Sequence, residues 1–138
     1  MRPLLMLAGA MLAPAPATPP STPREVVSAM FDAFNRHDAA TLQRLYAPDA
    51  RLTSPDFCSP RGRADVVRTY AALFTEFPDI RDTVQDLVVE GDRIAVRFVA
   101  TSRTHDLALP IQAMIQVRDG LIVRDDALFD TGGRPCQR

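Results

Sequence analysis

Apolar residues recur at helical spacing in three segments of the first half of the chain. The first segment opens at Thr22-Pro23-Arg24-Glu25, where a capping threonine, a proline suited to the first helical turn and a capping-box glutamate occur together. The apolar positions that follow predict one buried helix face. They are Val26, Val27, Met30, Ala33, Phe34 and His37.

Two further helices are predicted downstream. Asp38 is expected to cap a short helix carrying Leu42, Leu45 and Tyr46, which ends at Ala47-Pro48 because the residue before proline avoids helical dihedrals. A longer helix is predicted from Gly62 to Glu76, and Pro78 stops it. Its core stripe is expected to consist of Val66, Tyr70, Leu73, Phe74 and Phe77.

Strand patterns fill the rest of the chain. Ala50 to Ser54 is predicted to be a short strand, followed by a loop rich in turn-forming residues. Four longer strands are predicted after the third helix, with turns at Gly91-Asp92, His105-Asp106 and Asp119-Gly120. They cover Ile80 to Glu90, Arg93 to Arg103, Leu107 to Arg118 and Leu121 to Asp130.

Alternation within these strands separates a core face from an outer face. Ile94, Val96, Phe98, Ala100 and Ser102 share the face expected to be buried, which directs Arg97 outward. Three helices followed by a meander of antiparallel strands indicate an α+β fold. Helices on one side of a strongly curved sheet leave a concave space that side chains, water or a ligand must fill.

The first 17 residues differ from the rest. Arg2 supplies a positive charge, the apolar run from Leu4 to Leu12 is too short to span a bilayer, and Ala15 and Ala17 fit the small-residue rule for cleavage after Ala17. We therefore expect a periplasmic or secreted protein with no membrane span in its mature form. A Pro/Ala-rich N-terminus or a misplaced start codon is the alternative. The expected division is 1–17 signal peptide, 18–22 linker, 23–131 folded domain and 132–138 C-terminal tail.

Composition and charge exclude some partners. The chain of 138 residues is 46% hydrophobic and 24% charged, which is typical of a soluble globular protein. Sixteen basic and 17 acidic residues leave a net charge of −1, so we expect no nucleic-acid partner. Without a glycine-rich phosphate loop or a metal-ligand spacing, we also expect no cofactor and no metal.

Cys58 and Cys136 are the two cysteines. In an oxidising compartment an even count is compatible with one disulfide, which would tie the loop after the first strand to the C-terminal tail. Two unpaired thiols are the alternative. The sequence leaves both open, because spacing alone does not reveal whether the two side chains meet.

Several local strings, in this order, resemble the nuclear transport factor 2-like superfamily and its SnoaL-like domains. The strings are Phe34-Asn35-Arg36-His37-Asp38, Leu45-Tyr46-Ala47-Pro48-Asp49-Ala50, Gly62-Arg63, Phe77-Pro78-Asp79-Ile80 and Glu90-Gly91-Asp92-Arg93. The resemblance implies a cone-shaped α+β fold in which three N-terminal helices pack on a strongly curved, mostly antiparallel sheet.

The last third is similar to the limonene-epoxide-hydrolase-like branch through Leu109-Pro110-Ile111, Val117 to Ile122 and Leu128-Phe129-Asp130. That branch ends its last strand W-R-D-Y-F-D and activates water with an Arg/Asp/Asp set aided by a first-strand tyrosine and asparagine. The string falls on Asp125 to Asp130 and puts Ala127 at the acid position. The arginine of that set falls near Arg97, and the first-strand tyrosine and asparagine fall near Arg51 and Thr53. We therefore do not expect epoxide hydrolysis of that type.

Two other branches also match only in part. Ketosteroid-isomerase-like members carry a base aspartate just before a proline after the first strand, where this chain has Ser54-Pro55, with Asp56 two residues on. Polyketide-cyclase-like members often show a G-T-H string, whose nearest match is Thr104-His105. Asp56 is therefore either a shifted base or a turn former, and His105 either a catalytic group at the cone mouth or a solvated turn residue.

Asp125 is the third catalytic candidate. It shares strand parity with Val123, Ala127 and Phe129, which predicts that it points inward while Asp126 points outward. A carboxylate inside an apolar cone would have a raised pKa and could act as a base. The alternative is a structural pair with Arg97 or Arg103. Tyr46, Tyr70 and Thr53 are the candidate pocket residues, although both tyrosines also fit helix stripes as packing residues.

Three hypotheses of function follow. The first is an exported binder of a small apolar molecule in the cone cavity. The second is an isomerase, lyase or cyclase that uses Asp125, Asp56 or His105 for proton transfer. The third is a protein-interaction module, for instance a homodimer formed through the exposed face of the sheet. The fold alone does not decide among them, because one scaffold hosts many functions.

Overall fold

The computed structural model describes residues 12–15 and 18–138. Most of the predicted signal peptide, residues 1–11 and 16–17, lies outside the described residues, as does the predicted cleavage position after Ala17. None of the helices in the described part of the chain has the length and apolar content that a membrane crossing requires.

Three helices form where capping signals and apolar stripes coincide. α1 spans Pro23–Asn35, and its capping box is complete because Thr22 Oγ1 accepts from the Glu25 amide while Glu25 accepts from the Thr22 amide. α2 spans Ala39–Leu45 and is capped by Asp38. α3 spans Arg63–Glu76.

Five strands form one sheet in the order β1-β5-β4-β3-β2. Their bounds are β1 Tyr46–Thr53, β2 Arg81–Glu90, β3 Arg93–Ser102, β4 Leu107–Arg118 and β5 Leu121–Leu128. β1 pairs with β5 in parallel, and all other neighbours are antiparallel. Asp119 and Gly120, which join β4 to β5, both have positive φ (50° and 74°), as a two-residue hairpin turn requires.

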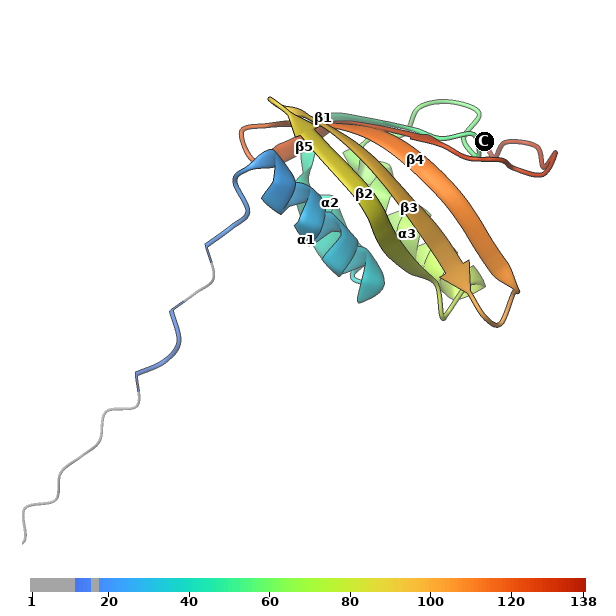
Figure 1. Cartoon of the computed structure of the whole chain (residues 1–138), viewed down its shortest axis with the longest axis horizontal. Coiled ribbons are helices and arrows are strands. Elements are labelled where there is room, and N and C mark those ends of the chain that lie inside the picture. Colours follow the sequence, from blue (N-terminus) through green and yellow to red (C-terminus); the bar gives the residue numbers. More distant parts are fainter. Residues whose placement is uncertain (1–11, 16–17) are drawn as a thin grey trace, which may run out of the picture.

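The sheet is strongly curved, and all three helices lie on its concave side (Figure 1). The core is the layer between them. Every second side chain of β3 was expected to face inward, and these side chains are buried, whereas Arg97 is exposed. The buried ones are Ile94, Val96, Phe98, Ala100 and Ser102. The predicted α+β cone with a mostly antiparallel sheet is therefore confirmed.

The predicted helical position of Tyr46 is wrong. α2 ends at Leu45, and Tyr46 takes an extended backbone as the first residue of β1, where it pairs with Ile122 of β5. The predicted strand therefore begins four residues too late. Pro48 disfavours helix only in Ala47, so the earlier end of α2 is due to the pairing of Tyr46 with β5, which local sequence does not reveal.

The predicted position of His37 on the buried stripe of the first helix is also wrong. α1 ends at Asn35, and His37 follows it with a left-handed backbone, φ 57°. Its Nε2 lies 2.9 Å from the carbonyl oxygen of Ile80, and its ring stacks on Phe74.

The stripe of α3 is less buried than predicted. Val66 is fully buried, but Tyr70, Leu73, Phe74 and Phe77 are only partly buried against the core. The reason is that the space between α3 and the sheet is hollow.

Candidate functional site

A cavity of about 590 Å³ lies between the helices and the concave face of the sheet. Its wall is largely apolar and includes Phe31, Phe34, Leu73, Phe98, Ile111 and Ile115. Such a volume and lining are typical of sites that hold small organic molecules. The helical layer and the curved sheet pack together in the core, where Phe31 of α1 contacts Phe98 of β3, and the cavity lies where the two layers diverge.

Asp125 of β5 lies on the wall of this cavity and is bonded to Tyr46 of β1. The Tyr46 hydroxyl donates to Asp125 Oδ2 at 2.7 Å, and the tyrosine side chain is completely buried. The parallel β1–β5 pairing, which sets Leu52 opposite Asp125, brings the two strands together from distant parts of the sequence. Burial raises the pKa of Asp125 to about 6, although the Tyr46 hydrogen bond opposes the shift.

Tyr70 of α3 completes a polar cluster with these two residues. Its hydroxyl neighbours that of Tyr46, and the pKa of Tyr70 is raised first by burial and then by the charge of Asp125. Burial likewise raises the pKa of Tyr46 well above its usual range. Both hydroxyls therefore stay protonated and can donate hydrogen bonds to Asp125 or to a ligand.

Asp82 of β2 is a second carboxyl on the cavity wall. Burial raises its pKa to about 7, and its Oδ1 atom is buried without a hydrogen-bond partner in the described structure. Its charge also raises the pKa of Tyr70, as does that of Asp125. Near neutral pH the carboxyls of Asp82 and Asp125 therefore bind protons more readily than exposed aspartates do.

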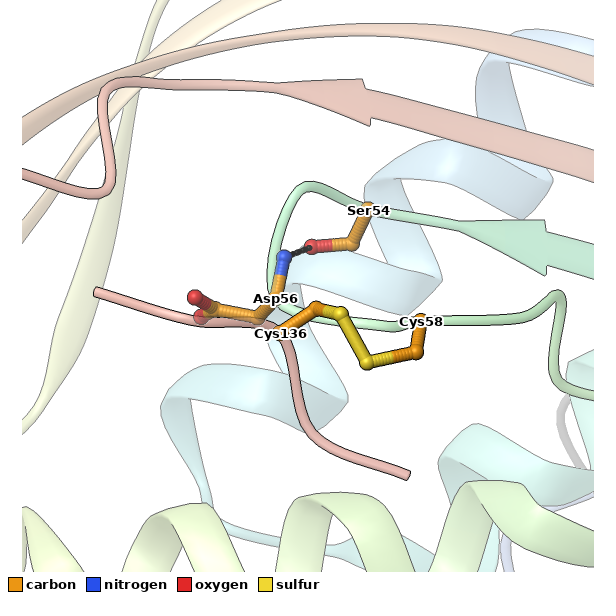
Figure 2. The surroundings of a disulfide bond; sticks show 4 residues. All are labelled: Ser54, Asp56, Cys58 and Cys136. Carbon is orange, nitrogen blue, oxygen red and sulfur yellow. Dashed lines mark hydrogen bonds between the residues drawn. A yellow bond between two sulfur atoms is a disulfide. The ribbon is translucent and has the colours of Figure 1, made fainter. Parts of the chain in front are cut away.

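The C-terminal tail forms one wall of the cavity. The backbone amide of Cys58 donates to the carbonyl oxygen of Gln137 at 3.0 Å, and the backbone amide of Gln137 donates to the carbonyl oxygen of Asp56 at 2.7 Å. A disulfide joins Cys58 to Cys136, with 5.0 Å between their Cα atoms (Figure 2). Arg134 adds an ion pair of 3.6 Å to Asp56. The tail is thereby held against the loop that follows β1.

The SnoaL-like domain family matches residues 27–125, which is most of the folded part of the chain. The chain belongs to the SnoaL-like domain family. This SnoaL-like chain has the nuclear transport factor 2-like fold. Its sheet order and its concave cavity are those described above.

Solved structures support the same assignment. A loop-truncation variant of IdmH is 32% identical with a TM-score of 0.72, and the match covers 80% of this chain and 94% of that one. Wild-type IdmH, a proposed polyketide cyclase from Streptomyces antibioticus, is 29% identical with a TM-score of 0.69 over 80% and 93%. A proposed ketosteroid isomerase from Kribbella flavida is 27% identical with a TM-score of 0.67 over 84% and 83%. No curated protein matches the chain.

In this SnoaL-like chain, two of the three predicted catalytic residues border the cavity. Asp125 lies deep in it, and Asp56 lies on its wall in the loop after β1, where it is paired with Arg134. The amide of Asp56 also donates to Ser54 Oγ, as in a turn (Figure 2). The surroundings of Asp56 are thus those of a turn residue that closes the cavity.

His105 is not part of the cavity wall. Its Nδ1 lies 3.2 Å from Ser102 Oγ and 3.0 Å from Thr104 Oγ1, and its ring packs against Phe77. Asp79 binds Ser102 and Thr104, and these hydrogen bonds, led by that of Ser102, hold the pKa of Asp79 well below its usual range. The cluster fastens the turn between β3 and β4 to the end of α3.

The predicted pocket residues fall in different places. Tyr70 and Thr53 line the cavity, and Tyr46 reaches it through Asp125. The hydroxyl of Thr53 donates to Asp126 at 2.7 Å, and Arg124 pairs with the same carboxylate at 2.8 Å. Asp126 is thus held by polar partners next to Asp125 in sequence. It can therefore serve as the control residue when Asp125 is substituted.

The arginine position of the epoxide-hydrolase-like pattern does not enter the cavity. Arg97 lies on the outer face of the sheet in an ion pair with Asp86. Ala127, at the pattern's acid position, lines the cavity without a polar group. The fold instead brings a first-strand tyrosine, Tyr46, to a last-strand acid, Asp125, at positions that fixed spacing does not identify.

Asp82 is the residue that sequence reasoning missed. A signal for it exists, because Ile80 is a core residue and Asp82 stands two positions later, on the same face of an extended chain. Among residues 12–15 and 18–138, no group of three His, Cys, Asp or Glu side chains is placed to bind a metal ion.

Proposed function

We propose that the protein binds a small, largely apolar molecule in its cavity and moves a proton within that molecule, as an isomerase, lyase or cyclase. Asp125 is the acid–base group. The observation that carries the proposal is a carboxyl on the wall of an apolar cavity, with a pKa raised to about 6 and a buried tyrosine donor at 2.7 Å. The printed descriptions of the neighbours, a proposed polyketide cyclase and a proposed ketosteroid isomerase, belong to the same reaction class.

The chemistry requires a base that becomes an acid. Above pH 6 the Asp125 carboxylate removes a proton from a carbon next to a carbonyl, and the enolate forms in a pocket where Tyr46 and Tyr70 can donate hydrogen bonds. The protonated Asp125, or Asp82 with its pKa of about 7, then returns a proton to another carbon. Two carboxyls whose pKa values lie near neutrality suit both halves of this cycle.

Binding is tested first with the neutral fluorescent probe N-phenyl-1-naphthylamine. Ile111→Trp fills the cavity and should abolish probe fluorescence, whereas Gln112→Trp, the next residue on the outer face of β4, should not. Equal binding by both variants and by the wild type would show that the probe does not use the cavity.

Proton transfer is tested with cyclohex-3-en-1-one, whose conversion to the conjugated enone is followed by absorbance. Asp125→Asn should lower kcat/KM by about 100-fold or more, whereas Asp126→Asn, which removes only a minor contribution to the raised pKa of Asp125, should change it far less. The wild-type profile should rise with pH through about 6. If the protein binds the probe but the two variants react at equal rates, the protein is a binding protein in which Asp125 has no acid–base function.

The same proposal includes export. The Cys58–Cys136 disulfide supports an oxidising compartment, as expected for a protein that carries a signal peptide. Fractionation of cells that express the full chain, followed by mass spectrometry of its N-terminus, tests both the location and cleavage after Ala17. A cytoplasmic protein that retains residues 1–17 would contradict export.

We also propose self-association through the outer face of the sheet. Val88, Met114 and Leu128 expose 65%, 47% and 70% of their surface. The helices α1, α2 and α3 lie on the opposite, concave side of the sheet (Figure 1). The register sets Val88 and Met114 opposite Ala95 on either side, so they form one apolar strip bordered by Arg97 and Asp86. Light scattering should report a dimer that Met114→Glu dissociates and that Arg36→Glu, on the helical side, leaves intact.

A further inference from the structure

Four arginines line the cavity, and two of them are already paired with an acidic side chain. Arg134 pairs with Asp56, and Arg68 pairs with Asp65. Arg138 and Arg61 form no ion pair with any Asp or Glu in the described part of the chain. Arg138 is exposed, so the unpaired arginine that is sheltered from solvent is Arg61. It is half-buried, so its charge is less screened than that of a surface arginine.

Arg61 is held in position by three other contacts. Its backbone bonds to Leu52 of β1 in both directions, at 2.8 and 2.9 Å. Its guanidinium stacks on the ring of Phe57, with Cζ 3.9 Å from the ring centroid, and Nη1 donates to Thr69 at 2.8 Å. A guanidinium has five N–H donors, and the described structure uses one of them. The remaining donors form a preorganised fork for a planar anion.

The position of Arg61 relative to Asp125 follows from strand register. Leu52 pairs with Arg61 on one side and with Asp125 on the other, so the three residues form one row across the sheet. Directly paired residues send their side chains to the same face, which is the concave one, since all three line the cavity. Two strand spacings separate the Cα atoms of Arg61 and Asp125 by roughly 10 Å.

We propose that the ligand is an apolar molecule that carries a carboxylate, bound by Arg61 about one small-ligand length from Asp125. The inference rests on the proposed function and adds its substrate class. Arg61 would hold the carboxylate near the loop after β1, while the apolar body reaches along the cavity toward Asp125 and Tyr46. The arginine thus fixes which carbon of the ligand lies beside the acid–base group.

The test uses a matched pair of ligands, 6-phenylhexanoate and its neutral amide, each competing with N-phenyl-1-naphthylamine for the purified protein at pH 7.5. The wild type should bind the carboxylate about tenfold or more tightly than the amide. Arg61→Gln should remove that preference without changing affinity for the amide. Arg68→Gln, which alters a cavity arginine already paired with Asp65, should retain it.

Arg61→Lys should keep part of the preference, because it retains the charge but loses the planar fork. A merely structural arginine would change thermal stability, not the carboxylate-to-amide ratio. Equal wild-type affinity for the two ligands overturns the inference without any variant, and so does a preference that survives in Arg61→Gln. If the neutral probe itself fails to enter the cavity, the proposed function fails and this inference fails with it.

Discussion

The side-chain amide of Asn35 makes two hydrogen bonds with the main chain of Asp82. Its Nδ2 donates to the carbonyl oxygen of Asp82 at 2.9 Å, and its Oδ1 accepts from the Asp82 amide at 2.8 Å. β2 is the edge strand of the sheet, so Asn35 acts as a substitute for a neighbouring strand at this position. The end of α1 is thereby attached to the strand that directs a carboxyl into the cavity.

Asn35→Ala should therefore destabilise the fold. The variant leaves a part-buried backbone donor and acceptor without partners, which should lower the free energy of unfolding by about 1–3 kcal/mol. Urea unfolding measures the difference. Thr101→Ala is the control, because it removes an exposed 3.3 Å hydrogen bond to the Arg81 carbonyl at the same sheet edge and should cost far less. Equal effects would show that the Asn35 pair is not a special attachment.

Stability should fall as pH rises through the titration of the two cavity carboxyls. Burial raises the pKa of Asp82 to about 7 and that of Asp125 to about 6, from an ordinary value of 3.8 that the unfolded chain retains. Between about pH 4 and 7 the folded state therefore binds more protons than the unfolded state, and the free energy of unfolding decreases with pH. We expect a loss of about 2–4 kcal/mol between pH 5 and pH 8.

Asp82→Asn should remove most of that loss, because Asp82 has the larger shift. Asp86→Asn, an exposed residue paired with Arg97, should leave it unchanged. Chemical denaturation at several pH values checks both variants. A wild type that gains stability from pH 5 to pH 8 would show that the cavity carboxyls do not control this range.

Tyr46→Phe should raise the pKa of Asp125 further. The hydroxyl donates at 2.7 Å and stabilises the charged carboxylate, so its removal leaves burial unopposed. A shift of about one unit is expected, and ¹³C NMR titration of the Asp125 carboxyl measures it. Tyr70→Phe should give a smaller change, since the structure shows no direct hydrogen bond from Tyr70 to Asp125. A pKa that falls or does not move in Tyr46→Phe would contradict the assigned role of this bond.

The disulfide should matter for both stability and ligand exchange. Cys58 and Cys136 are 78 residues apart in sequence, so their bond restricts most of the unfolded domain. Replacing both by serine should lower the free energy of unfolding by about 2–5 kcal/mol. It should also speed release of N-phenyl-1-naphthylamine, because the tail that forms one cavity wall is then held by only a few hydrogen bonds and one ion pair.

Thermal melts with and without reductant, together with stopped-flow release of the probe, test this pair of effects. Arg134→Ala is the control, since it removes the tail's ion pair with Asp56 but keeps the disulfide, and it should cost less than about 1 kcal/mol. Unchanged probe release after reduction would mean that the tail does not limit access to the cavity.

The sequence by itself determined the elements whose signals are local. The capping box at Thr22 and Glu25, the Asp119-Gly120 turn and the alternation from Ile94 to Ser102 each predicted the observed structure, because each depends on neighbouring backbone groups or on strand geometry. Parity alone also directed Asp125 inward and Arg97 outward.

Only the tertiary structure decided what surrounds those residues. Tyr46 meets Asp125 because β1 pairs in parallel with β5, a contact between residues 79 positions apart that no local pattern encodes. The same register sets Arg61 in a row with Asp125, and the attachment to Asn35 holds Asp82 at the cavity. A pKa depends on burial and on nearby charges in space, so the acid–base properties of this site follow from strand pairing and not from spacing along the chain.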